Sequence, residues 1–358
     1  MKTDKKNQHY IPKFYLKNFS YENNKKEIGI FNLKSSFFYQ RSKLKSQGSK
    51  NFFYGYDGVI EDWLSEIEGH LATFIREINE SLKPPKKHSK KHFELLAFIN
   101  LTYLRNPLQI ENIKASKEQL KKRLLELHPT VDVNKFIPEV SHESAIDMAL
   151  SGVKDAIENT SDLAFKLLIN KTSIPFISSD FPIVKYNQFL EERKWQHGKT
   201  GLGLMGLQIF VPINPELIII LYDLATYKVG TKKSDTLEIT SQKDVDQFNS
   251  LQILNCIETV FFNEQISEHY IRRLYDKCKG LQRPNQSKSQ VSFIADKEGD
   301  SSKLEKENLI IVGTTDCEIK LNVNGIKQLS SARNRKLDNR IAQMRKHPEK
   351  IRRQRDGR

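Results

Sequence analysis

Four side chains of types used in catalysis lie at points where the sequence pattern changes. Two of them are His9 and Asp180. His9 lies in a stretch of aromatic, polar and basic residues at 7–20, shortly ahead of the rigid Pro12. A histidine in such a place can act as an acid, a base or a metal ligand. Asp180 follows an apolar run and precedes Pro182, a position typical of general bases and metal-ligating carboxylates. Each has a structural alternative, since the His9 ring can cap a turn and Asp180 can form an Asx-turn.

The other two are a glutamate and an arginine in a region predicted to be helical. Glu61 and Glu68 are seven residues apart in a helix expected over 57–82, so both lie on one helix face. Paired carboxylates there can hold Mg²⁺ or share a proton, and pairing with lysines or water is the structural alternative. Arg105 ends an apolar helix, where its guanidinium must meet a carboxylate, helix carbonyls or a phosphate. A salt bridge is its structural alternative.

Hydrophobic spacing predicts the elements that hold these residues. Apolar residues recur at intervals of three and four over 57–82, which indicates an amphipathic helix. A second helix, capped by Ser89 and reaching Leu104, is apolar nearly all round and is therefore expected in the core. The other expected elements are helices over 110–127, 143–169, 241–260 and 266–279, hairpins of 28–33 with 36–40 and of 207–212 with 217–222, and a strand over 174–184.

These elements predict an α+β fold with a small β-rich N-terminal element, a helical bundle, then a β-hairpin and helices. A basic, disordered C-terminal tail is expected to follow. The predicted organisation is a main domain over 1–280, divided into a β-rich part at 7–56, a helical part at 57–170 and a β/α part at 174–280, then a linker at 281–306, a small hairpin of 309–312 with 319–323 within 307–330, and the basic tail at 331–358.

Composition places the protein among cytoplasmic globular proteins that need no membrane. Hydrophobic residues make up 38% of the chain and charged residues 28%. No apolar run approaches the roughly 20 residues that span a bilayer, and no apolar segment of a secretory signal follows the N-terminus. The three cysteines are far apart, which argues against a disulfide framework or a zinc cluster. Walker A, dinucleotide-binding and nucleophile-elbow motifs are absent from the sequence.

Positive charge is concentrated at the two ends of the chain. The formal net charge is +14, and residues 1–56 hold twelve Lys and Arg against three Asp and Glu. Residues 331–358 hold eleven against three. Such basic segments are typical of nucleic-acid binding, with improved solubility as the simpler explanation. The residues we expect to contact nucleic acid are Lys13, Lys17, Arg333, Arg335, Arg340, Arg352 and Arg353.

The N-terminal pattern Gln8-His9-Tyr10-Ile11-Pro12-x-Phe14-x-Leu16-x-x-Phe19 resembles the opening of a bacterial family of unknown function, DUF4238. Further landmarks follow in the family's order, and the resemblance covers about residues 7–265. These landmarks are Glu61 before Glu68, Arg105-x-Pro107, Ser179-Asp180-x-Pro182, and Pro212 with Pro215. The resemblance implies an α+β fold and marks His9, Glu61, Arg105 and Asp180 as recurring positions. It implies no established activity.

The function predicted from these residues is that of a metal-dependent nuclease serving as a toxin or phage-defence effector. His9 would act as the acid or base, and Arg105 would clamp a phosphate. Glu61 and Asp180 would hold the expected cofactor, Mg²⁺. A non-catalytic protein that binds nucleic acid or an acidic partner is the alternative. An enzyme acting on a small phosphorylated metabolite is a third possibility.

Overall fold

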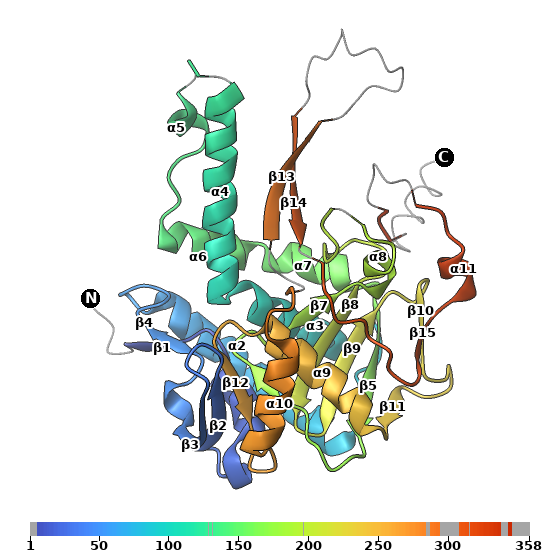
Figure 1. Ribbon diagram of the computed structural model, residues 1–358. Coiled ribbons are helices and arrows are strands. Elements are labelled where there is room, and N and C mark those ends of the chain that lie inside the picture. Colours follow the sequence, from blue (N-terminus) through green and yellow to red (C-terminus); the bar gives the residue numbers. More distant parts are fainter. Residues whose placement is uncertain are drawn as a thin grey trace.

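The computed structural model describes residues 6–127, 129–130, 132–195, 197–283, 287–293, 308–314, 316–337 and 343–345 of the chain. Helices and sheets are both extensive, so the predicted α+β class is confirmed (Figure 1). No described helix is both long enough and apolar enough to cross a bilayer. The three cysteines are buried and free.

A five-stranded sheet forms the centre of the molecule (Figure 1). Its strands in spatial order are β11 (Thr236–Ile239), β5 (Ala164–Asn170), β9 (Leu217–Tyr222), β8 (Gln208–Asn214) and β7 (Val184–Tyr186). All neighbours are antiparallel except β11 and β5. The predicted hairpin of 207–212 with 217–222 is thus confirmed. Every residue of β9 is buried, as expected for a strand covered on both faces.

Helices cover the two faces of this sheet. One face is covered by α2 (Val59–Ser81) and α3 (Lys90–Leu104), which confirms both predicted helices. The opposite face is covered by α9 (Gln242–Asn255) and α10 (Glu268–Cys278). Alternate side chains of β9 enter the two cores, because successive residues of a strand point to opposite faces. These two helices of the predicted bundle therefore form a layer on the sheet.

A second, four-stranded sheet joins the N-terminal segment to the middle of the chain. Its order is β3 (Phe37–Lys43), β2 (Glu27–Asn32), β12 (Thr259–Phe262) and β6 (Ser178–Ser179). The hairpin expected near 28–40 is confirmed as β2 and β3. Because β12 pairs with β2 on one side and with β6 on the other, the N-terminal element is built into the main body.

The remaining helices of the first half correct one prediction. They are α4 (Pro107–Leu127), α5 (Val133–Phe136), α6 (His142–Ser151) and α7 (Val153–Thr160). The helix predicted over 143–169 breaks at Gly152 and ends at Thr160, and β5 follows it. Periodicity does not separate a short apolar run in a strand from the end of a helix, and pairing of β5 with β9 decides in favour of the strand.

The second half adds short elements around the central sheet. They are α8 (Gln188–Glu191), β10 (Tyr227–Val229), β15 (Ile326–Gln328) and α11 (Ser330–Arg333), with β10 paired to β15. The helix predicted over 241–260 ends at Asn255, because residues 259–262 pair with β2 and β6 as β12.

The predicted linker and final hairpin are also corrected. Strand β13 (Ser287–Phe293) lies inside the expected linker and pairs antiparallel with β14 (Asn308–Thr314). The segment 319–323, which was expected to pair with 309–312, is not a strand. The β13–β14 hairpin projects from the body near α4 (Figure 1). Most of the predicted basic tail, at 338–342 and 346–358, lies outside the described residues.

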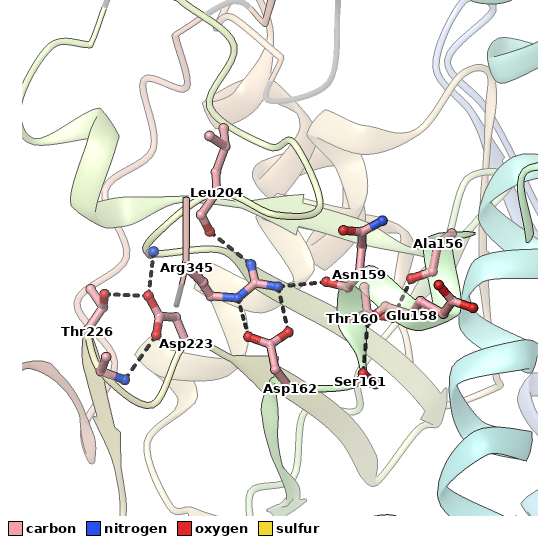
Figure 2. Close-up of polar contacts among 12 residues, drawn as sticks. Ala156, Glu158, Asn159, Thr160, Ser161, Asp162, Leu204, Asp223, Thr226 and Arg345 are labelled. Carbon is pink, nitrogen blue, oxygen red and sulfur yellow. Dashed lines mark hydrogen bonds and ion pairs between the residues drawn. The ribbon is translucent and has the colours of Figure 1, made fainter. Parts of the chain in front are cut away.

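A short C-terminal segment is fastened to the body by Arg345 (Figure 2). The guanidinium makes a bidentate ion pair with the carboxylate of Asp162, at 2.8 and 2.9 Å. It also donates to the carbonyls of Leu204 and Asn159, at 2.9 and 2.7 Å, and the Arg345 backbone N–H donates to Gly203. The side chains of Arg345 and Asp162 are only 6% and 8% exposed, so this is a buried clasp.

Candidate active site

The N-terminal motif holds His9 in place through a two-stranded sheet and a tight turn. β1 (Asn7–His9) pairs with β4 (Ser49–Asn51). Ahead of β4, Gly48 has a φ of +62°, and its carbonyl accepts from the Ile11 N–H. A Cβ on Gly48 would lie 2.8 Å from the Cβ of Ile11, so the turn requires glycine. The motif is therefore a folded unit rather than a tail.

Gln8 connects this unit to the loop before α2. Its Nε2 donates to the carbonyl of Gly55 at 2.9 Å, and its Oε1 accepts from the Tyr54 N–H at 2.5 Å. The Tyr54 hydroxyl donates in turn to the backbone carbonyl of His9 at 3.2 Å. Neither Gln8 nor Tyr54 was predicted from the sequence to act at the site. Their hydrogen bonds fix the backbone on both sides of His9.

His9 is buried, at 4% exposure, and is held in one tautomer. Its Nε2 lies 3.2 Å from the carbonyl of Lys45, which can only accept, so Nε2 carries the proton. Nδ1 therefore holds a lone pair, and it has no hydrogen-bond partner among the described residues. Burial, helped by the positive charges of Lys13 and Arg105, lowers the pKa of His9 to about 4. At neutral pH the ring is an uncharged base.

Arg105 follows α3 immediately and is the largest of the fully buried side chains. Its Nη2 lies 2.8 Å from Oε1 of Glu68, whose side chain is 20% exposed. The Tyr54 hydroxyl is hydrogen-bonded to the guanidinium, and Nε and Nη1 are buried and form no ion pair with a described residue. Tyr54 and Glu68 counter the cost of burial and raise the pKa of Arg105, so it stays a cation. The predicted salt bridge exists, and it leaves Nε and Nη1 outside the ion pair.

Glu61 lies on the same face of α2 as Glu68, as their spacing predicted. Burial and the neighbouring charge of Glu68 raise the pKa of Glu61. Arg105, the His9 backbone N–H and Lys13 oppose this shift without cancelling it. The structure thus brings His9, Glu61, Glu68 and Arg105 into one electrostatically coupled group, which we call the His9 cluster.

Asp180 lies next to this cluster, and its carboxylate is hydrogen-bonded to a turn of the backbone. Its two carboxylate oxygens accept the backbone N–H groups of Ile257, Glu258 and Thr259, at 2.7, 2.8 and 3.0 Å. Its backbone carbonyl accepts from Nδ2 of Asn106, the residue after Arg105, at 2.7 Å. Burial raises the pKa of Asp180 despite these donors. The carboxylate therefore shapes the turn into β12, and its metal-ligating role stays a prediction.

The expected Mg²⁺ ligands do not form a metal centre. Within the described ranges, no group of three or more His, Cys, Asp or Glu side chains is placed to hold an ion. The Asp180 carboxylate is taken up by the backbone, and Glu68 is paired with Arg105. Among the described residues the cluster itself supplies a base, an acid and a cation, and binding of Mg²⁺ through Glu61 and Asp180 stays a prediction.

The residues expected to bind nucleic acid fall into separate groups. Lys13 opens α1 (Lys13–Leu16), Lys17 opens the 3₁₀ turn η1 (Lys17–Phe19), and both are exposed on the side of His9. Arg333 and Arg335 are exposed in and just after α11, on the opposite side of the molecule from β1 (Figure 1). These two groups do not form one surface. Arg340, Arg352 and Arg353 lie outside the described residues.

Comparison with known proteins gives one match. The model of a family described as "Protein of unknown function (DUF4238)" matches residues 7–265. That range contains the whole His9 cluster and Asp180. No curated protein and no solved structure matches the chain.

Proposed function

The chain belongs to the DUF4238 family, and because the function of that family is unknown, we propose one from the site itself: cleavage of phosphodiester bonds in nucleic acid. The observation that carries this proposal is Arg105. Arg105 is 1% exposed, pairs through Nη2 with Glu68 and adjoins the Tyr54 hydroxyl, and its Nε and Nη1 form no ion pair among the described residues. Buried donors need acceptors, and phosphate oxygens fit an arginine fork.

His9 and Glu61, which both feel the charge of Arg105, supply a base and an acid in the same cluster. Water attacks phosphorus, and Nδ1 of His9 accepts the proton that the water loses. The bond from phosphorus to the leaving nucleoside oxygen breaks, and Glu61 gives that oxygen a proton. The raised pKa of Glu61 suits this role, and a bound phosphate would raise the low pKa of His9 towards neutrality. Arg105 stabilises the charge that develops on the phosphoryl oxygens.

The surroundings of His9 support a single-stranded nucleic acid as substrate. Exposed Lys13 and Lys17 can contact phosphates. Phe37 and Tyr39 are 54% and 49% exposed and stacked with ring centroids 6.0 Å apart. They lie on edge strand β3, which leads into the turn whose Lys45 carbonyl holds His9. Unpaired bases stack on such rings, whereas paired bases do not.

The proposal is tested by incubating purified protein with labelled single-stranded and double-stranded RNA and DNA, in Mg²⁺ and in EDTA. His9→Gln keeps a donor for the Lys45 carbonyl but cannot shuttle a proton. We expect it to lose about 10²- to 10⁴-fold in cleavage rate while binding is retained. Arg105→Lys keeps a charge but loses the fork, so it should weaken both binding and cleavage.

The matched control is His70→Gln, because His70 is an exposed histidine of α2. It should cleave like the unaltered protein, and melting temperatures of all variants establish that they are folded. Failure of the folded protein to cut any of the four substrates overturns the proposal, as does a folded His9→Gln variant with unchanged rate. If the enzyme is a toxin or phage-defence effector, expressing it should arrest cell growth and expressing His9→Gln should not.

A further inference from the structure

The side chain of Lys199 is almost entirely removed from water and meets two carboxylates. It is 1% exposed, and its Nζ pairs with Oε2 of Glu191 at 2.9 Å and with Oδ1 of Asp316. The side chain of Glu191 is 7% exposed and that of Asp316 is 54% exposed. We call these three residues the Lys199 triad. None of them belongs to the His9 cluster, and the proposed nuclease mechanism uses none of them.

The local backbone holds the triad together. Asn187 caps α8 with its side chain, and its Nδ2 donates to the backbone carbonyl of Lys199 at 2.9 Å. Glu191 is the last residue of α8, and its two carboxylate oxygens have different partners. Oε2 accepts from Lys199, and Oε1 accepts from the backbone N–H of Cys317 at 3.1 Å. Glu191 therefore connects the lysine to the segment that carries Asp316.

The buried carboxylate of Glu191 is suited to exchanging protons with Lys199. Burial raises the pKa of Glu191, although Lys199 and the Cys317 N–H oppose the shift. Transfer of a proton from the Lys199 ammonium to Glu191 replaces two buried charges by two neutral groups, which lowers the cost of burial. The product is an uncharged amine in contact with a carboxyl group, and an uncharged lysine amine is a nucleophile.

From this arrangement we propose that Lys199 and Asp316 join in an isopeptide bond, with Glu191 as the proton shuttle. Nζ of Lys199 attacks Cγ of Asp316, and a C–N bond forms. The ammonium loses two protons, which Glu191 accepts one after the other and passes to one oxygen of Asp316. The bond from Cγ to that oxygen breaks, and the oxygen leaves as water. The other oxygen becomes the amide carbonyl, and Glu191 ends as the carboxylate it was at the start.

Proximity and partial exposure both favour this condensation. Groups held in contact react as if present at effective concentrations of about 10⁵ to 10⁸ M. The exposed part of Asp316 gives the released water a path to solvent. The bond would tie the segment after β14 to the loop after α8 and close a long loop of the chain, which restricts the unfolded state. An ordinary ion pair is the structural alternative. The assignment is independent of nuclease activity, so failure of either proposal leaves the other standing.

Mass spectrometry of the denatured full chain tests the assignment. An ion pair leaves the mass unchanged, whereas the isopeptide bond lowers it by one water molecule. We expect most molecules to show the lower mass, and a tryptic digest to contain one branched peptide that joins Lys199 to Asp316. A chain at its full sequence mass overturns the proposal. So does a loss of water that maps to a single unbranched peptide, such as a succinimide at Asp57-Gly58.

Variants assign the three roles. Lys199→Arg keeps a cation for both carboxylates but cannot form the amide, and Asp316→Ala lacks the carbon that is attacked, so both should show their full masses. Glu191→Gln keeps both reacting groups and loses the shuttle, so most of its molecules should remain unreacted. Glu192→Gln makes the same change at the exposed neighbouring residue and should react like the unaltered chain. Loss of water in Lys199→Arg overturns the bond, and equal reaction of Glu191→Gln and Glu192→Gln overturns the shuttle.

Discussion

At the scale of single residues, folding keeps the side chains of His9 and His92 uncharged at neutral pH. Burial lowers the pKa of each to about 4, from an ordinary value of 6.5. The ring of His92 is stacked on Phe165, with centroids 4.8 Å apart, and its Nδ1 accepts from the His88 N–H. Neither ring is hydrogen-bonded to a carboxylate among the described residues, so nothing there replaces water in stabilising the imidazolium.

The two histidines make stability depend on pH between about 6.5 and 4. In that window the unfolded chain binds more protons than the folded one, so the free energy of unfolding falls as the pH falls. Between pH 7.5 and 5 the expected loss is about 2 kcal/mol per histidine. Urea unfolding at both pH values measures it.

The comparison that isolates this effect is a His9→Gln, His92→Gln double variant. Glu61 and Glu191, whose pKa values are raised, titrate in the opposite sense and are shared by both proteins. The double variant should therefore lose clearly less stability than the unaltered protein on acidification. Equal losses in the two proteins would contradict the histidine assignment.

The sequence identified the important side chains more readily than it identified their roles. The spacing of Glu61 and Glu68 placed both on one helix face, and the position of Arg105 at a helix end implied an acidic partner. Asp180 was expected to ligate a metal, because a carboxylate at a strand end suits either a metal or a turn. Only the fold reveals that three backbone N–H groups from residues 257–259 converge on it.

At the scale of elements, β3 combines an open edge with exposed aromatic rings. Its rings Phe37 and Tyr39 are two residues apart and so lie on one side of the strand. From Tyr39 to Lys43 the strand extends roughly 13 Å at 3.3 Å per residue, and the 3₁₀ turn that contains Lys45 follows directly, so a nucleic-acid strand bound at the rings would need to extend little further to reach His9.

The double variant Phe37→Ala, Tyr39→Ala should bind single-stranded nucleic acid more weakly if these rings stack bases. Loss of stacking costs about 1–3 kcal/mol per base, which is roughly 5- to 150-fold in the dissociation constant. Fluorescence anisotropy of a labelled oligonucleotide measures this change. Phe136→Ala removes an exposed ring in α5 and is the control. If Phe136→Ala weakens binding equally, β3 has no special role.

Elements with a clear period or cap were predictable, and ambiguous ones were not. Helix α2 has a strong apolar stripe, and the Ser89 side chain caps α3 as expected. β5 was predicted as the end of a helix, because seven residues of mostly apolar sequence fit either state. β13 was predicted as a linker because its sequence is polar. Its pairing with β14 is a tertiary interaction that the local sequence pattern does not reveal.

At the scale of the whole molecule, the Arg345 clasp joins the end of the described chain to the end of α7 and to the loop before β8. Without Arg345, the buried carboxylate of Asp162 loses its bidentate partner. Removing one member of a buried ion pair typically costs about 3–5 kcal/mol. A chain that stops after residue 345 should therefore melt like the full chain, and one that stops after residue 337 should melt several degrees lower.

Arg345→Met in the full chain separates the clasp from the rest of the deleted segment. It should reproduce most of the loss in melting temperature, measured by differential scanning fluorimetry. Arg333→Met removes an equal charge from an exposed position in α11 and should leave the melting temperature nearly unchanged. A stable Arg345→Met variant would mean that the clasp contributes little to folding.

The opposite placement of Lys13 and Lys17 from Arg333 and Arg335 has a further consequence. A protein whose cationic groups line one groove grips a single polymer along its length. Cations on opposite sides would instead hold two polyanionic chains at once, so if both groups bind nucleic acid, as we propose, the molecule would cross-link neighbouring strands.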